Sequence, residues 1–164
     1  MDPPYKYVQN KKKPKLNEKT GKLVTQDVWY LNNNLFYNNQ ISFWVKLKVV
    51  NYAKDFLMLY MDDIPKLDKA RITITYRHTK DTFDLDNKAD FWKKILLDIM
   101  KTPTDKQRAK AEEKGIVLKT IECLPDDTVR YVDQHITKFE RGEHELDIEI
   151  FGVLANVQAD LFDS

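Results

Sequence analysis

The sequence predicts a single α+β domain built around a mixed sheet. Three observations carry this expectation: one strictly alternating stretch at 70–77, two segments with apolar residues every three or four positions, and two short alternating stretches near the end. A length of 164 residues with 42% hydrophobic residues suits one domain with a packed core. The expected element order is β-α-β-α-(α)-β-β.

The first half of the chain provides a strand, a loop, a helix and a second strand. A short extended segment begins at Trp29 and runs into an asparagine-rich loop that ends near Gln40. An amphipathic helix follows and ends near 62–63, with apolar positions at Ile41, Val45, Val49, Tyr52, Phe56 and Tyr60. Residues 70–77 then form a half-buried strand, with Ala70, Ile72, Ile74 and Tyr76 on its apolar face.

The second half begins with a helix over 88–100, whose apolar stripe is Phe91, Trp92, Ile95, Leu96 and Ile99. Thr102 then resembles a helix N-cap, with Pro103 at the first helical position, and the polar helix that it opens stops at Gly115. The face of this helix is either solvated or applied to an anionic partner. Strands at 129–139 and 144–151 follow as a hairpin, and 152–164 is expected to be a tail.

Charge is distributed unevenly along the chain, although the formal net charge is only +1. Residues 1–22 hold seven lysines and two acidic residues, so the rest of the chain is mildly acidic. We expect 1–26 to be a flexible basic arm, either a solvated end or a means of holding a phosphate backbone. The candidate DNA-binding residues are Lys11, Lys12, Lys13 and Lys15, together with Arg77 on the 70–77 strand.

Several classes of protein are excluded by composition. No apolar stretch approaches the roughly 18 residues of a membrane span, and the N-terminus lacks the apolar core of a secretory signal. The single cysteine, Cys123, cannot form an internal disulfide, and no Cys/His cluster suggests zinc. We therefore expect a cytoplasmic protein.

Acidic residues gather where the 70–77 strand leads into the second helix. Asp84 and Asp86 are two residues apart, and in an extended chain such positions point to the same side. Two neighbouring carboxylates favour a hard cation such as Mg²⁺ between them. A second acidic pair, Asp126 and Asp127, precedes the 129–139 strand and can bring a third carboxylate to the same place.

The same residues also have a purely structural interpretation. Asp86 or Asn87 can cap the helix, and Asp126 with Asp127 can form an ordinary turn. The helix itself carries Asp90, Lys94 and Asp98 on one face, where a lysine could stabilise charge on a phosphate.

The ordered set of motifs resembles the RusA-type Holliday junction resolvases over about 70 residues. The residues that carry the resemblance are Asp84-Leu85-Asp86-Asn87, Lys94, Ile95-Leu96-Leu97-Asp98, Leu124-Pro125-Asp126-Asp127, Val129, Tyr131 and Leu146-Asp147-Ile148-Glu149-Ile150, and more weakly Asn33-Asn34-Leu35-Phe36-Tyr37. The resemblance implies a Mg²⁺-dependent homodimer that nicks four-way DNA junctions symmetrically during recombination and repair. It implies a bacterial or phage-infected cell, one or two Mg²⁺ ions, and Asp84, Asp86 and Asp127 as catalytic metal ligands.

The chain departs from the family pattern in two ways. Four extra residues separate the acidic motif from the helical lysine, so the catalytic lysine of the family is assigned to Lys94, with Lys88 as the rival. The arm 1–26 and a basic helical insertion at 101–119 are additions to a nuclease domain spanning 27–151.

The end of the chain, Gln158 to Ser164, looks like the short peptide by which bacterial repair proteins dock on the sliding clamp. In that mode Gln158 hydrogen-bonds the clamp, while Leu161 and Phe162 fill an apolar pocket. The alternatives are that these side chains fold back on the domain or that the match arose by chance.

Two other functions remain open. One is a fork or flap nuclease that uses the same acidic site. The other is a non-catalytic junction-binding adaptor linked to the clamp, although clustered aspartates facing phosphates would weaken a pure binder.

Overall fold

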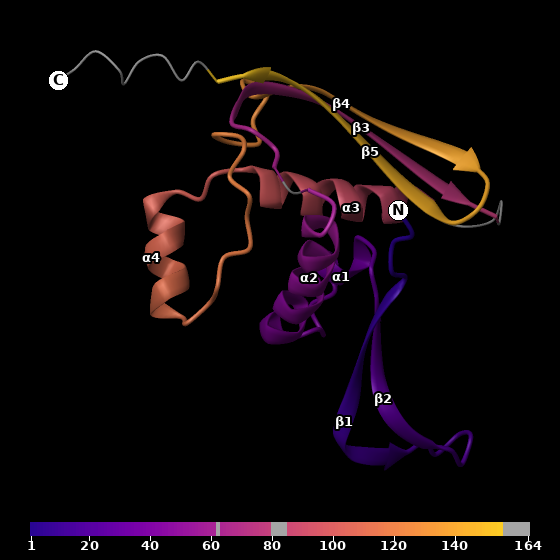
Figure 1. The fold of residues 1–164 in the computed structure, drawn as a ribbon. Helices are drawn as coiled ribbons and strands as arrows, with labels where there is room; N and C mark the ends of the chain where they lie inside the picture. The colour runs from indigo at the N-terminus through magenta and orange to yellow at the C-terminus, as the bar shows by residue number, and fades with distance from the viewer. Residues whose placement is uncertain (62, 80–84, 156–164) are drawn as a thin grey trace.

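A three-stranded sheet covers the helices in the computed structural model, and a long two-stranded hairpin extends away on the other side of them (Figure 1). The structure describes residues 1–61, 63–79 and 85–155, with the side chains of Leu85 and Asp86 excepted. The predicted α+β class, with one domain and a mixed sheet, is confirmed.

The sheet has the order β4-β3-β5 and is mixed in direction. The central strand β3 (Leu67–His78) pairs in parallel with β4 (Val132–Arg141) and antiparallel with β5 (Glu145–Leu154). The hairpin expected between the last two strands is therefore wrong, because β3 lies between them. β3 is the most buried of the three strands because of its apolar residues. A neighbouring strand on each side provides hydrogen-bond partners for both edges of its backbone.

One face of this sheet packs on α3 (Leu85–Met100), and α3 packs on α2 (Phe43–Met58). All five predicted stripe residues of α3 are at most 1% exposed, as are Ala70, Ile72, Ile74 and Tyr76 of β3. The ring of Trp92 lies 5.5 Å from that of Phe56 on α2, centre to centre. The predicted core is thus confirmed for α3 and β3, with α3 beginning three residues earlier than expected. On α2 the prediction holds only in part, because Tyr52 and Tyr60 are exposed, whereas Ala53 and Leu57 are fully buried with Val49.

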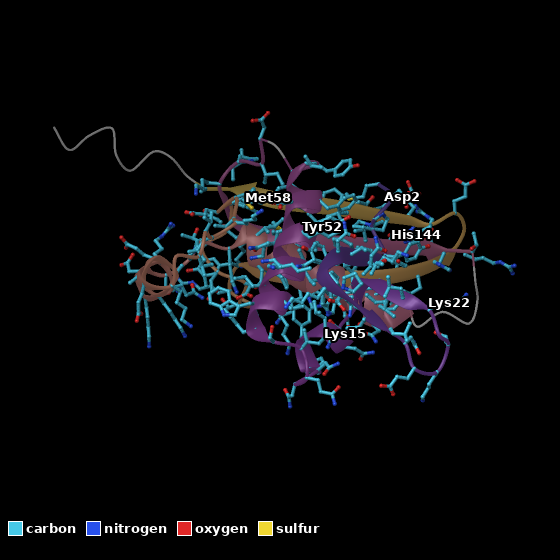
Figure 2. The ribbon with its side chains drawn as sticks, turned by 90° about the horizontal axis from the view of Figure 1, so that it is seen from below. Asp2, Lys15, Lys22, Tyr52, Met58 and His144 are labelled. Carbon is cyan, nitrogen blue, oxygen red and sulfur yellow. The ribbon has the colours of Figure 1, made fainter. Side chains whose placement is uncertain are left out.

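The basic segment 1–26 is not an irregular arm. It forms β1 (Lys6–Leu16), which pairs antiparallel with β2 (Leu23–Tyr30), so this expectation is corrected. The base of the hairpin contacts α2, since the Tyr7 ring of β1 lies 5.4 Å from that of Tyr52, centre to centre. Within the hairpin, the same ring lies 5.9 Å from Trp29 of β2. Lys15 and Lys22, which Figure 2 labels, lie in its distal half.

Other element boundaries also differ from expectation: α2 ends at Met58 rather than near 62–63, β4 begins at Val132 rather than at 129, and the extended segment expected from Trp29 begins at Leu23 as β2. The N-cap of α4 (Asp105–Glu113) is Thr104 rather than Thr102, because Thr104 and Gln107 satisfy each other in a capping box. Gly115 ends α4 as predicted, with φ at 62°, in the left-handed region that glycine tolerates. Residues 152–154, expected in the tail, belong to β5, where Gly152 pairs with Ala70.

A short helix α1 (Asn34–Tyr37) interrupts the asparagine-rich loop. Across the described ranges, no helix is long and apolar enough to cross a membrane.

Candidate functional site

A polar groove of about 380 Å³ brings together three segments that are distant in the sequence. The asparagine-rich loop contributes Asn33 and Tyr37, and the loop before β4 contributes Asp127. The rest of the wall comes from α3 and the residue following it, namely Asp90, Lys93, Lys94, Leu97, Asp98 and Lys101. Two carboxylates of the helix thus share a groove with the carboxylate of the distant loop.

Lys101 joins the two walls of this groove. Its Nζ lies 3.1 Å from an oxygen of Asp98 and 3.1 Å from one of Asp127. Burial alone would raise the pKa of Asp127, but the hydrogen bond and charge of Lys101 outweigh it, and the pKa is lowered. The Asp127 carboxylate is therefore held ionised by its ion pair with Lys101.

Lys101 was missed by the sequence analysis. A signal was available, because Lys101 follows Asp98 by three residues, which on a helix makes an ion-pair spacing. Its contact with Asp127, by contrast, joins residues 26 positions apart and depends on the tertiary fold.

The remaining charged side chains of α3 in the groove are one aspartate, Asp90, and two lysines, Lys93 and Lys94. Lys93 pairs with Asp90 at 2.6 Å, whereas Lys94 places its Nζ 5.0 Å from the centre of the Phe36 ring. The Phe36 ring in turn stacks on Phe91 at 5.5 Å. Lys94 is thus oriented by an aromatic surface, without a carboxylate partner among the described residues, and its ammonium can meet an anion entering the groove.

The asparagine-rich loop is fixed on the start of α3. The backbone N–H of Asn33 donates to the carbonyl oxygen of Asn87 at 3.1 Å. This bond joins the segment around Asn33 to the acidic motif, and both were part of the family resemblance.

The acidic motif itself is only partly described. Asp84 lies outside the described residues. Asp86 lies in the first turn of α3, so the extended geometry expected for it is wrong, and its side chain is not described. Among the residues that the structure does describe, no three His, Cys, Asp or Glu side chains gather as a metal site.

Asp126 and Lys88 occupy other environments. An oxygen of Asp126 accepts the backbone N–H of Asp127 at 2.9 Å, which fits the turn interpretation for that residue. Lys88 is 7% exposed, and its Nζ lies 6.0 Å and 5.7 Å from the ring centres of Tyr5 and Tyr30 at the base of the hairpin. Of the two candidate lysines, Lys94 alone lines the groove with Asp127.

The predicted DNA-binding residues fall into two groups. Lys12, Lys13 and Lys15 are exposed on the hairpin, whereas Lys11 pairs with Asp27 at 2.8 Å. The guanidinium of Arg77 contacts the carboxylates of Glu140, Glu145 and Asp147, and these hydrogen bonds raise its pKa. Arg77 therefore ties the three strands together at one end of the sheet.

Gln158, Leu161 and Phe162 of the tail lie outside the described residues.

Comparison with known proteins yielded no match to a family model, to a curated protein or to a solved structure.

Proposed function

We propose that this protein is a Mg²⁺-dependent, structure-specific DNA endonuclease that resolves four-way junctions, similar to the RusA-type resolvases. One observation carries the proposal. Asn33 and Tyr37, Lys94 and Asp98, and Asp127 come from the separate motifs of the resemblance, and they line one groove. These motifs span some 95 positions of the chain, from residue 33 to residue 127, and packing by itself does not require their polar side chains to meet.

The carboxylates available fit a hard cation, because Mg²⁺ prefers oxygen ligands and keeps several waters. Asp127 would hold it together with Asp84 and Asp86, as the family resemblance implies. Bound Mg²⁺ polarises a phosphate and lowers the pKa of an attacking water.

The protein groups have separate tasks in this proposal. Lys94 binds a non-bridging oxygen of the phosphate and neutralises the charge that develops there. Lys101 keeps Asp127 ionised and connects its loop to α3. A homodimer would present two equivalent grooves to the two opposed strands of a junction.

The direct test is cleavage of a labelled four-way junction, resolved on a denaturing gel with and without Mg²⁺. Asp84→Asn should abolish paired nicks while leaving junction binding nearly unchanged. The matched control is Asp133→Asn, because Asp133 pairs with Lys69 on the sheet, outside the groove. Nicking by Asp84→Asn at the wild-type rate would refute the proposal.

Substrate choice distinguishes the remaining alternatives. Preferential cutting of forks or flaps over four-way junctions would favour the flap nuclease. Tight binding of all three substrates, with no Mg²⁺-dependent product, would favour the non-catalytic adaptor.

A further inference from the structure

A second cavity, of about 330 Å³, lies between α2, α4 and the segment 116–120. Five lysines and one acidic residue line it: Lys54, Lys101, Lys110, Lys114, Lys119 and Asp98. Three of the five belong to α4 or to the residues that follow it, in the polar insertion. We refer to this cavity as the insertion cleft.

The positive charge of the insertion cleft is only partly compensated within the protein. Lys101 pairs with Asp98 and Asp127, and Lys119 pairs with Asp55. In the part of the chain that the structure describes, the ammonium groups of Lys54 and Lys110 have no hydrogen-bond or ion-pair partner. An excess of cationic side chains around one cavity is a site for an anion.

Lys54 is the costliest of these lysines to keep charged. It projects from α2 and is half-buried, and burial lowers its pKa. Asp98 opposes this shift, whereas the neighbouring Lys101 adds to it. An ammonium held there without a partner disfavours the folded protein, and an anion in the cleft removes that penalty.

The walls of the cleft also contain apolar surface suited to a nucleobase. Phe43, at the start of α2, lines the cleft and is 54% exposed, with the ammonium of Lys114 lying 5.3 Å from the centre of its ring. The ring of Trp44 packs against it at 5.4 Å and is 57% exposed. Exposed aromatic rings next to a basic groove are the usual combination for binding single-stranded nucleic acid.

The insertion cleft adjoins the groove that holds Asp127, because Asp98 and Lys101 line both. We propose that the cleft binds one nucleotide of an unpaired DNA strand next to the phosphate that is cut. Lys54 and Lys110 bind its phosphate, and Phe43 contacts its base. This inference rests on the proposed nuclease function for the identity of the strand.

Binding can be measured without cleavage, using the full chain, a fluorescein-labelled 12-nucleotide single strand and EDTA. Lys54→Met and Lys110→Met should each weaken binding about tenfold, the usual effect of losing one charged hydrogen bond. The matched control is Lys48→Met, because Lys48 is exposed on the same helix α2 and lies outside the cleft. It should change binding less than twofold.

Thermal melting separates lost binding from lost folding. Lys54→Met should melt at or above the wild-type temperature, because it removes a half-buried charge and keeps an apolar side chain of similar length. If Lys54 served only to stabilise the fold, Lys54→Met would instead melt at a lower temperature than wild type.

Competition with inorganic phosphate and with dAMP identifies the source of the phosphate group. If the cleft binds a DNA strand, inorganic phosphate and dAMP should displace the oligonucleotide only at concentrations far above that of the oligonucleotide. The inference is overturned if Lys54→Met and Lys110→Met bind the strand as wild type does, or if dAMP or phosphate competes as well as the strand. Lys54-dependent strand binding without any junction cleavage would instead refute the nuclease proposal and leave the cleft in place.

Discussion

Lys101 stands between two aspartates, since its Nζ lies 3.1 Å from Asp98 and 3.1 Å from Asp127. One of these carboxylates belongs to α3 and the other to the loop before β4. Two like charges can face each other across the groove because the ammonium lies between them. The same lysine also lines the insertion cleft, so the two cavities adjoin at Lys101.

Replacing Lys101 with methionine should raise the pKa of Asp127. Burial of this carboxyl raises its pKa, and Lys101 supplies the largest opposing effects. Carboxyl carbon NMR titration in the absence of metal measures the shift. Lys93→Met is the control, since Lys93 lines the same groove but pairs with Asp90. An unchanged Asp127 titration in Lys101→Met would show that the ion pair does not form in solution.

Lys94 and Lys88 should respond differently to alanine. Lys94→Ala removes the ammonium from the groove and should slow junction cleavage about 10²- to 10³-fold at an unchanged melting temperature. Lys88→Ala removes a buried ammonium lying over the Tyr5 and Tyr30 rings and should lower the free energy of unfolding by about 2 kcal/mol. Single-turnover cleavage and chemical denaturation measure the two effects. A larger loss of cleavage in a folded Lys88→Ala would reverse the assignment.

The hairpin lysines should govern the salt dependence of DNA binding. Replacing Lys12, Lys13 and Lys15 together with glutamine should reduce the slope of log K against log salt by about 0.9 for each phosphate that these lysines neutralise. Lys11→Gln should change the slope less, because Lys11 is already paired with Asp27. Filter binding of a four-way junction over a salt series gives both slopes. Equal slopes for the triple variant and wild type would mean that the hairpin does not touch DNA.

Stability should fall as the pH decreases below about 6.5, the ordinary histidine pKa. Burial lowers the pKa of His144, and this outweighs the effect of its hydrogen bond to Asp2, beside which it lies in Figure 2. Since the unfolded chain then binds more protons than the folded one, protonation favours unfolding as the pH falls. Melting temperatures from pH 7 to pH 5 should drop more steeply for wild type than for His144→Gln. Parallel curves would contradict this assignment.

Deletion of residues 158–164 should abolish capture by a bacterial sliding clamp and leave junction cleavage unchanged. The tail carries the apolar pair Leu161 and Phe162, which the clamp pocket would bury. A pull-down with purified clamp measures the first effect. A double substitution to alanine at 161 and 162 should match the deletion. Capture that survives both changes would rule out docking through this peptide.

Apolar periodicity predicted the buried faces of α3 and β3, because burial depends mainly on which face of an element is apolar, but on α2 it included Tyr52 and Tyr60, which are exposed. The stripe of α3 and the alternation of β3 follow from spacing alone, and each of their core residues is at most 1% exposed. Strand pairing was harder, since alternation identifies a strand but not its neighbour. The insertion of β3 between β4 and β5 therefore contradicted the expected hairpin. The lysine-rich β1 has no strong apolar alternation from which a strand could be predicted. It is a strand because its backbone pairs with that of β2.

For the candidate site too, some features follow from the sequence and others only from the tertiary structure. From the sequence alone came the residue types, namely the acidic motif, the helical lysine and Asp127, because carboxylates and lysines at short spacing have recognisable chemistry. Only the tertiary structure decided that Lys94 rather than Lys88 lines the groove with Asp127, and that Lys101 bridges Asp98 to Asp127. It also decided that Lys54 of α2 faces the lysines of the insertion across one cleft. These contacts join residues far apart in the chain, and such distances depend on how helices and loops pack rather than on local spacing.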